Sequence, residues 1–403
     1  MIACNSELRK LLLQYNTNRY LIKYDEKVYI TATSSYFPNE KVVNDDMELY
    51  LGKLGDKPSR LKSIVLRQNG IKSRYYALDT NQQITHTNAE MAAKAINGLF
   101  ATEEEKNKTK LLSFGTSTPD QWLPSQAAMV HGETFNYPME IFSAAGVCLT
   151  SLNALKVAYM AVAGGWCDNA VSANSELVSP VLLSKLFEKE YDCLAEVAAN
   201  PILAFEKDFL RFMLSDGAAA VHLQPEKHGD KNLLIDWIEM VSYAGELPAC
   251  MYMGAEGMPD KSIRSWKNYT AEEIGTHSLW AIKQDVKLLN EFAIARFVDA
   301  IERAISLHDV DLNKIRYVIP HISSMFFYKK LEDEINARGI NLPESKWYTN
   351  LTWVGNVGSV APVAALDELL RTMPIEPGDQ IMLLVPESGR FSYGVALLTF
   401  EGE

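Results

Sequence analysis

A cysteine, a histidine and an asparagine each stand where the sequence predicts a turn between a strand and a helix. Cys148 follows a short apolar strand-type run and precedes residues 149–163, whose apolar positions recur at helical spacing. His321 follows Pro320 at the end of a predicted strand, and Asn356 precedes a predicted helix. Loops at the carboxyl ends of parallel strands gather functional groups at one edge of a sheet. The three side chains are therefore candidates for one shared site.

Cys148 is the candidate nucleophile of that site. The first N–H groups of a helix are unpaired and carry the positive end of its dipole, so a thiol there can lose its proton. The small residues at 143–146, Ser-Ala-Ala-Gly, permit a tight turn and leave room for a substrate. The alternative is a buried structural cysteine, because free cysteine is among the most buried residue types. Likewise, His321 could be a hydrogen-bonded structural histidine and Asn356 a helix cap or turn residue.

The composition argues against several classes of protein. Of the 403 residues, 47% are apolar and 22% are charged, which is typical of a folded globular protein. A formal net charge of −12 argues against a general nucleic-acid binder. The five cysteines show no CxxC spacing, so we expect neither a disulfide framework nor a metal site. No apolar run approaches the roughly 20 residues that cross a bilayer, so we expect a cytoplasmic protein without membrane insertion.

Strands and helices alternate twice along the chain. The expected strands are residues 27–34, 109–118, 168–176, 214–223, 233–243, 317–322, 347–352, 380–386 and 393–400. The expected helices are residues 86–101, 149–163, 280–307, 325–338 and 361–373. The alternation predicts an α/β fold of mostly parallel sheets covered by helices, and the repeated order indicates two similar halves. We expect an N-terminal helical extension over residues 1–26, a first half over 27–230 that carries the nucleophile, and a second half over 231–403.

Two further segments have more than one interpretation. Residues 57–74 carry basic side chains and no acidic one: Lys57, Arg60, Lys62, Arg67, Lys72 and Arg74. They form either a solvated basic face or a docking site for a phosphate-bearing or acidic partner. Residues 178–208 are a long mixed segment between two predicted strands, which is typical of a lid or pocket wall.

The motifs around the three candidate residues resemble those of a known family. The Cys148 turn, the Pro-His321 strand end and Gly-Asn356-Val-Gly-Ser are similar to the active-site motifs of thiolase-fold condensing enzymes, specifically the β-ketoacyl-[acyl-carrier-protein] synthase III family. The resemblance runs from about Lys27 to Phe400 and includes the closing segment 386–394. It implies a thiolase-like α/β fold with two pseudo-symmetric halves of mixed sheets layered with helices. The entry-side segments near residues 50–60 and 69–75 resemble the subgroup that makes dialkylresorcinol and aryl-polyene lipids.

The resemblance also implies a mechanism. Cys148 would take an acyl group from a thioester and then undergo Claisen condensation with a malonyl- or β-ketoacyl thioester, and in the subgroup a ring closure to a resorcinol-type product would follow. His321 and Asn356 would donate hydrogen bonds to the thioester oxygen, while backbone N–H groups of Cys148 and Gly389 would form the oxyanion hole. Substrates would be carried by coenzyme A or an acyl carrier protein, without a metal or other cofactor. A homodimer is implied as well, with the loop near Trp122 contacting the neighbour.

Two departures from the family pattern leave alternatives open. The motif His321-Ile-Ser-Ser replaces the usual His-Gln-Ala-Asn, which leaves the second substrate undecided. Related enzymes take a proton with a glutamate from the partner subunit, but the matching loop, Asp120–Pro124, has none, and Asp120 is its nearest carboxylate. One alternative is an acyltransferase acting on an oxygen or nitrogen nucleophile. The other is an inactive partner subunit of a ketosynthase, although the presence of all three polar groups argues against it.

Overall fold

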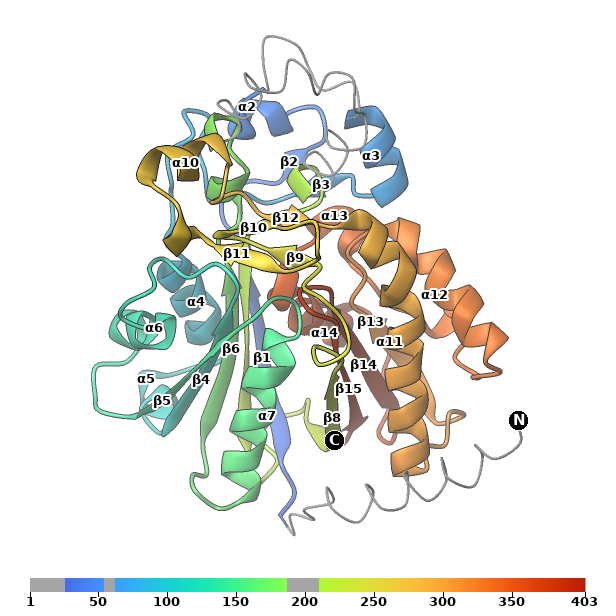
Figure 1. The fold of residues 1–403 in the computed structure, drawn as a ribbon. Helices are drawn as coiled ribbons and strands as arrows, with labels where there is room; N and C mark the ends of the chain where they lie inside the picture. Colours follow the sequence, from blue (N-terminus) through green and yellow to red (C-terminus); the bar gives the residue numbers. More distant parts are fainter. Residues whose placement is uncertain (1–25, 54–61, 187–209, 403) are drawn as a thin grey trace.

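The computed structural model describes residues 26–53, 62–186 and 210–402 (Figure 1). The predicted extension over residues 1–26 therefore lies almost wholly outside the described residues, as do Lys57, Arg60 and most of the segment 178–208. In the described part of the chain, a single nine-stranded sheet links the two halves.

The first half contributes five strands. They are β1 (Tyr29–Tyr36), β4 (Leu111–Thr116), β5 (Glu140–Ala145), β6 (Ala170–Glu176) and β7 (Gly217–Gln224). Their order across the sheet is β5-β4-β6-β7-β1. The strand β4 runs parallel to both of its neighbours, whereas β7 runs antiparallel to β6 and β1. The strands β4 and β6 are buried along their whole length, and β7 over all but its last residue, so this half is covered on both faces.

The second half repeats this arrangement. Its strands are β8 (Leu233–Ser242), β13 (Ile315–Pro320), β14 (Gln380–Glu387) and β15 (Ser392–Phe400), in the order β13-β14-β15-β8. The strand β13 is parallel to β14, and β15 is antiparallel to both of its neighbours. Where the first half has β5, the second has a single parallel bridge between Val318 and Trp347. Strand order and direction thus match between the halves, which confirms the expected pseudo-symmetry, and β1 joins β8 through an antiparallel pair.

Two helices occupy equivalent places in the halves. The helix α7 (Thr150–Ala163) packs on β4 and β6, and α14 (Ala361–Thr372) packs on β1 and β13. Buried leucines of both helices, Leu152 and Leu369 among them, belong to one apolar cluster. Figure 1 shows α7 and α14 near the middle of the molecule, with α4 and α6 flanking the first half and α11 and α12 flanking the second.

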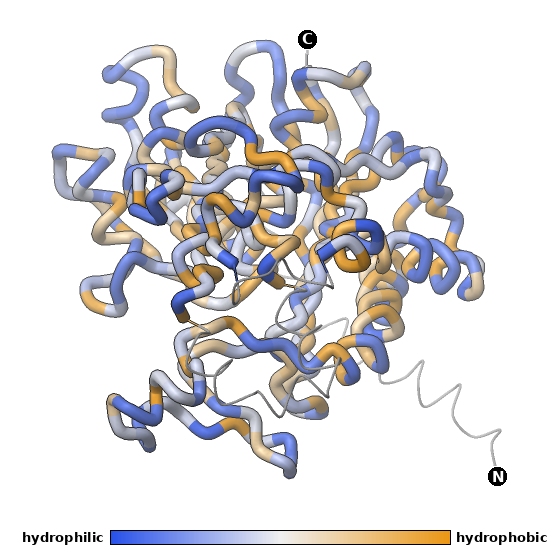
Figure 2. The backbone as a smooth tube through the Cα atoms, turned by 90° about the horizontal axis from the view of Figure 1, so that it is seen from above, coloured by the Kyte–Doolittle hydropathy of each residue, from blue (hydrophilic) through white to orange (hydrophobic). Residues whose placement is uncertain are grey.

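The remaining helices lie around this frame. Their bounds are α2 (Met47–Leu51), α3 (Lys62–Asn69), α4 (Asn88–Asn97), α5 (Glu103–Lys106), α6 (Gln126–Thr134), α10 (Ala271–Thr276), α11 (Val286–His308), α12 (Met325–Ala337) and α13 (Leu351–Val354). None of the helices in the described ranges is long and apolar enough to cross a membrane. Figure 2 shows that hydrophilic stretches are concentrated in the outer loops.

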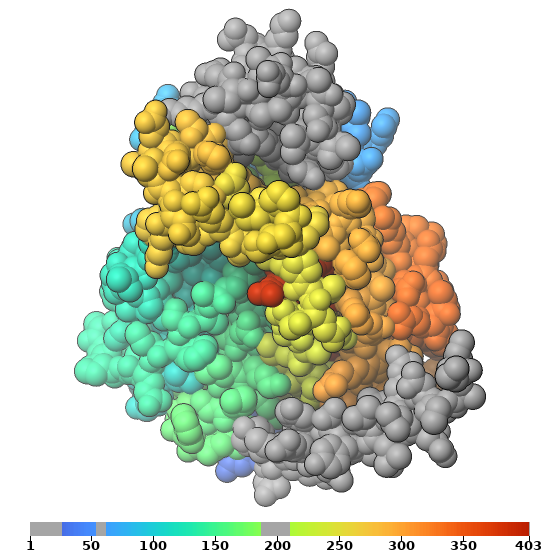
Figure 3. Space-filling view, viewed as in Figure 1, coloured from blue at the N-terminus to red at the C-terminus, as the bar shows by residue number. Residues whose placement is uncertain are grey.

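A small subdomain separates β8 from α11, and the sequence analysis did not anticipate it. It contains β9 (Met251–Tyr252), β10 (Ala255–Gly257), β11 (Ile263–Ser265), α10 and β12 (Lys283–Gln284), with β9 paired to β12 and β10 to β11. Figure 3 shows this yellow segment lying across the front of the molecule above the first half. Trp266 and Trp280 of the subdomain contact Trp122, with ring centroids 5.0 and 5.4 Å from that of Trp122.

Two expected elements differ from the structure. The predicted strand 347–352 is wrong, because only Trp347 bridges to β13 and α13 begins at Leu351. Thr349 Oγ1 accepts the N–H of Leu351, and such local side-chain bonding favours a turn over a strand. The predicted helix 280–307 begins later, at Val286, because residues 283–284 pair with β9 instead.

Candidate active site

Cys148 lies in the turn between β5 and α7. Leu149 is the N-cap of α7 and Thr150 its first helical residue, so Cys148 stands just before the helix rather than opening it. Its side chain is only 7% exposed. The Thr150 hydroxyl donates to the carbonyl oxygen of Val147 at 2.6 Å, which tightens the turn around the cysteine. The thiol is thus fixed at the junction between a strand of the first half and the central helix.

The electrostatic surroundings of Cys148 contradict the expected thiolate. Burial raises the pKa of the Cys148 thiol above its ordinary value, and the nearby carboxylates of Glu387 and Glu176 raise that pKa further. The N–H groups beside the thiol do not serve it, because Glu387 Oε2 accepts those of Val147 at 2.9 Å and Leu149 at 3.2 Å. A carboxylate therefore occupies the positive end of α7. The resting thiol is neutral.

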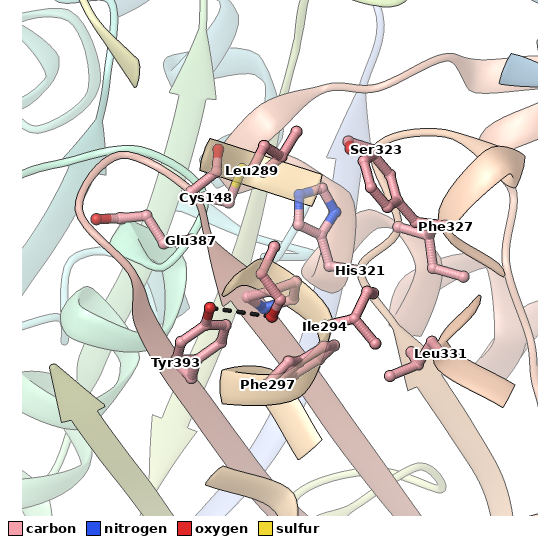
Figure 4. Close-up of a pocket in the computed structure, with 14 residues that line it drawn as sticks. Cys148, Leu289, Ile294, Phe297, His321, Ser323, Phe327, Leu331, Glu387 and Tyr393 are labelled. Carbon is pink, nitrogen blue, oxygen red and sulfur yellow. Dashed lines mark hydrogen bonds between the residues drawn. The ribbon is translucent and has the colours of Figure 1, made fainter. Parts of the chain in front are cut away.

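His321 and Cys148 line the same cavity (Figure 4). Half of the remaining lining residues are apolar side chains of α11 and α12: Leu289, Ala293, Ile294, Phe297, Phe327 and Leu331. Tyr393 closes part of the wall by donating to the carbonyl oxygen of Ala293 at 3.0 Å. The cavity thus extends from the thiol into the apolar interior of the second half.

The imidazole of His321 is buried and neutral. Burial lowers the pKa of His321 to about 4. Within the described residues, its Nε2 atom has no hydrogen-bond partner although it is inaccessible to solvent. An unpaired buried polar atom is costly unless a ligand or water completes it. His321 therefore presents a free polar atom to the cavity that it shares with Cys148.

Asn356 lines a second, more polar cavity that also contains Cys148. The other polar lining residues are Ser117, Glu176, Ser215, Gln284, Ser323 and Ser388. The Oδ1 atom of Asn356 accepts the N–H of Gly358 at 3.1 Å, and the Asn356 backbone N–H donates to Met213 at 3.0 Å. These bonds fix the side-chain amide, and its Nδ2 group remains as the hydrogen-bond donor.

The two cavities meet at the thiol. Cys148, Ser323 and Ser388 line both, so the structure brings His321 and Asn356 to two cavities that share the candidate nucleophile. Gly389, the other predicted member of the oxyanion hole, is beside this turn. A Cβ atom at Gly389 would come within 3.0 Å of the Val147 side chain, yet Gly389 lines neither cavity. Its role remains a prediction.

The sequence analysis missed the two carboxylates nearest the thiol. Glu176 is the last residue of β6, and Glu387 is the last residue of β14. The buried Glu176 carboxylate accepts hydrogen bonds from the hydroxyl groups of Ser117, Thr118 and Ser359. Each glutamate ends a strand-type run in the sequence, as Asn-Ser-Glu176 and Val-Pro-Glu387, and this position was the only available signal.

Two other predicted features lie away from the cavities. Asp120 accepts the N–H groups of Asn88 at 2.8 Å and Ala89 at 3.0 Å, so it caps α4 and lines neither cavity. The basic segment 57–74 is not one face: Arg74 is fully buried, and Lys62 pairs with Glu48 at 3.0 Å. Arg67 and Lys72 are exposed. Of the predicted pocket wall 178–208, the described residue Val178 lines the second cavity.

Comparisons with known proteins agree with this arrangement. Residues 305–400 match the family described as 3-oxoacyl-[acyl-carrier-protein (ACP)] synthase III C terminal. The β-ketoacyl-[acyl-carrier-protein] synthase III of Clostridium kluyveri is 23% identical over 375 residues, which cover 92% of this chain and 98% of the relative. The corresponding protein of Clostridium botulinum strain Langeland is 23% identical over 371 residues, with the same two coverages of 92% and 98%.

Solved structures show the same fold. AbyA1, described as a tetronic acid condensing enzyme, aligns with a TM-score of 0.70 at 19% identity, covering 93% of this chain and 100% of AbyA1. The 3-oxoacyl-[acyl-carrier-protein] synthase III of Aquifex aeolicus aligns with a TM-score of 0.64 at 19% identity, covering 92% and 99%. A histidine-to-alanine variant of OleA from Xanthomonas campestris aligns with a TM-score of 0.68 at 17% identity, covering 93% and 98%.

The repeated strand order and these neighbours define a thiolase-like fold. Within that fold, residues 305–400 match the synthase III C-terminal family, and 92% of the chain is similar to the β-ketoacyl-[acyl-carrier-protein] synthase III of Clostridium kluyveri. The dialkylresorcinol and aryl-polyene subgroup remains a prediction from the sequence.

Proposed function

We propose that the protein is a condensing enzyme that loads an acyl group onto Cys148 and then joins it to a second thioester. The observation that carries this proposal is that Cys148 lines two cavities, a largely apolar one that contains His321 and a second one with more polar side chains that contains Asn356. An acyl chain fits the apolar cavity, and the polar cavity fits the thioester group of the second substrate. The curated relatives named β-ketoacyl-[acyl-carrier-protein] synthase III support the same class of reaction.

The loading step is a thiol exchange. The Cys148 sulfur attacks the carbonyl carbon of a thioester, the bond to the carrier sulfur breaks, and the thiol proton leaves with that carrier thiol. Glu387 accepts the N–H groups of Val147 and Leu149, whereas the Cys148 backbone N–H faces its own sulfur and lowers the pKa of the thiol. This direction toward the reacting atom supports the proposed role of the Cys148 N–H in the oxyanion hole, with Gly389 as the second donor.

The condensing step forms a carbon–carbon bond. A malonyl unit that loses carbon dioxide, or a β-ketoacyl unit whose acidic α-proton passes to water, attacks the acyl carbonyl and releases the Cys148 thiolate, which takes a proton back from water. Negative charge develops on the oxygen of the second thioester, where Asn356 Nδ2 and His321 would donate hydrogen bonds. We propose coenzyme A or an acyl carrier protein as the carrier of both substrates, and ring closure of the product as a further step.

A homodimer in a reducing compartment such as the cytoplasm completes the proposal. The strand β5 is at the edge of the sheet, and its Ile141 and Phe142 are 39% and 41% exposed. Unpaired backbone groups beside apolar side chains make an edge strand prone to pairing with another chain. Leu123, in the loop expected at the interface, is 87% exposed. The described cysteines are free thiols, which supports a reducing environment.

Intact-protein mass tests the reaction. Wild type and Cys148→Ala are incubated with acyl-coenzyme A and acyl-carrier thioesters and then with malonyl or β-ketoacyl thioester. We expect an adduct on wild type alone that disappears as a longer or cyclic ketone is released. Transfer only to alcohols or amines would instead establish an acyltransferase. Absence of any adduct on folded wild type would favour the inactive partner subunit.

A further inference from the structure

Glu176 and Glu387 occupy equivalent positions in the two halves. In the sheet, β6 lies between β4 and β7, and β14 lies in the equivalent place between β13 and β15. Each strand is parallel to the neighbour that precedes it in sheet order, β4 or β13. Both strands end at their glutamate. The pseudo-symmetry therefore places one carboxylate at the same edge of each half.

Each carboxylate crosses to the other half. Glu387, from the second half, accepts the N–H groups of Val147 and Leu149, which flank Cys148 in the turn before α7. Glu176, from the first half, accepts the hydroxyl and N–H of Ser359, three residues after Asn356 in the segment before α14. A carboxylate from the opposite half therefore binds the segment just before each central helix. The helix α7 follows Cys148, and the helix α14 follows Asn356.

Neither glutamate has a free cation beside it in the site. No Lys or Arg lines either cavity among the described residues, so both carboxylates are held by N–H and hydroxyl donors alone. Burying two carboxylates costs desolvation free energy, which their hydrogen bonds offset only in part. We therefore expect each carboxylate to have a role in holding the site. Figure 4 shows the Glu387 carboxyl group turned away from His321, so it does not point at the space where His321 would act.

We propose that Glu387 and Glu176 are paired positioning residues, the first fixing the Cys148 turn for acyl loading and the second fixing the Asn356 turn for condensation. The inference rests on the proposed function. Glu387 accepts the N–H groups on both sides of the cysteine, so the Cys148 N–H remains as the donor to the carbonyl oxygen of a bound substrate. Glu176 holds Ser359 and so sets the direction of the segment whose amide Nδ2 lines the second cavity. One half therefore orients the reacting group of the other.

The proposal predicts different defects for the two glutamates. In Glu387→Gln, acyl loading onto Cys148 should fall about 10²-fold, because misplacement of a reacting group by about 1 Å costs that much. In Glu176→Gln, loading should stay within a few fold of wild type while release of the condensed product falls about 10²-fold. Single-turnover mass measurements of adduct formation and adduct loss separate the two steps. Asp120→Asn is the matched control, because Asp120 caps α4 in the same way outside both cavities.

A second readout needs no thioester. Removing the Glu387 charge beside the thiol should lower the pKa of Cys148, so iodoacetamide should alkylate Glu387→Gln about tenfold faster than wild type at pH 8. Loading and alkylation would then change in opposite directions. Glu387→Asp keeps the charge but shortens the reach, so it should load slowly and alkylate within about threefold of wild type. This variant carries the test if thermal melting shows that Glu387→Gln has lost its fold.

The outcomes separate this inference from the proposed function. If wild type takes no acyl group from any thioester, the proposed function fails, and the alkylation rates still decide the role of Glu387. If wild type loads normally but the two glutamine variants load and condense as wild type does, the positioning inference is wrong. It is equally wrong if Asp120→Asn shows the same losses, since a general loss of stability would then explain them.

Discussion

The two halves share one strand order across the sheet but differ at its outer edge, where the strand that comes third along the chain belongs. The first half has β5 there, a complete edge strand whose Phe142 is 41% exposed. The second half has only the bridge at Trp347, after which α13 turns the chain inward. The same frame therefore yields an open edge and a cysteine in one half, and a closed edge and an asparagine in the other. The repeated strand order supplies the positions, and the local sequence decides the chemistry.

The sharpest test of this comparison removes the equivalent residues Cys148 and Asn356 one at a time. Cys148→Ala should abolish the acyl adduct and lower turnover by about 10⁴-fold or more, because the nucleophile is lost. Asn356→Ala should still load an acyl group but condense about 10²- to 10³-fold more slowly, because it loses one donor to the developing charge. Adduct mass and product release measure the two steps. Equal loss of loading in both variants would contradict the division of roles.

The open edge of the first half should be an interface and the second half should not. A charge buried there without a partner costs about 3–5 kcal/mol, so Phe142→Lys should weaken self-association by about 10²-fold or more. Phe326→Lys is the matched control, because Phe326 on α12 is 37% exposed on the other half. Light scattering after size-exclusion chromatography, over a range of protein concentrations, measures the molar mass of each variant and hence its self-association. A monomeric wild type, or equal dissociation of both variants, would count against the edge.

The apolar cavity is lined largely by α11 and α12 of the second half, so we expect these helices to set the preferred length of the acyl chain. Ile294→Trp fills part of the lining and should shift loading toward shorter acyl chains by about tenfold, because each methylene contributes on the order of 1–3 kcal/mol to discrimination. Met160→Trp on α7, 41% exposed, is the control and should change nothing. Competition among acyl thioesters of different length gives the preference. Unchanged preference in Ile294→Trp would place the chain elsewhere.

The smallest expected effect concerns pH, since each half contributes a neutral group at rest. The pKa of His321 is lowered to about 4 and that of Cys148 is raised, both mainly by burial. Between about pH 5.5 and 9, His321 therefore stays neutral and the thiolate fraction keeps rising. The loading rate should increase without a step near the ordinary histidine pKa of about 6.5 and without levelling near the ordinary thiol pKa of about 8.5. A loading profile with a clear step near the ordinary histidine pKa would show a protonated imidazole and contradict this.

Much of the frame was predictable because its elements are long and periodic. The buried runs of β4, β6 and β7 and the apolar spacing of α7 gave strands and helices near their observed bounds. Trp347 misled the prediction, since a strand-type run there is broken by local bonding at Thr349. The subdomain over residues 251–285 escaped because its strands are only two or three residues long and hold together through contacts such as Trp122 with Trp266.

The sequence predicted the residues of the candidate site, but it did not predict the direction in which the pKa of the Cys148 thiol is shifted. Cys148, His321 and Asn356 could be chosen because each follows or precedes a recognisable element, and the structure gathers them around two joined cavities. The protonation state of the thiol could not be predicted correctly from the sequence, because its position before a helix by itself indicates a stabilised thiolate. The opposite shift comes from burial and from Glu387, which reaches the Cys148 turn from a strand near the other end of the chain.

The sequence by itself determined the local elements, the repeated order of strands and helices, and the three residues able to perform acyl chemistry. The elements and their order follow from periodicity, which acts over a few residues, whereas the acyl chemistry is implied by the resemblance of the motifs around Cys148, His321 and Asn356 to those of a known family. The tertiary structure alone decided that Cys148 lines both a largely apolar cavity and a more polar one. It also decided that β5 is an exposed edge strand whereas the second half has only the bridge at Trp347. Finally, it decided that a glutamate of each half binds the other half. Such features depend on contacts between distant segments, and hydrogen bonding and desolvation have no pattern along the chain until those segments are packed together.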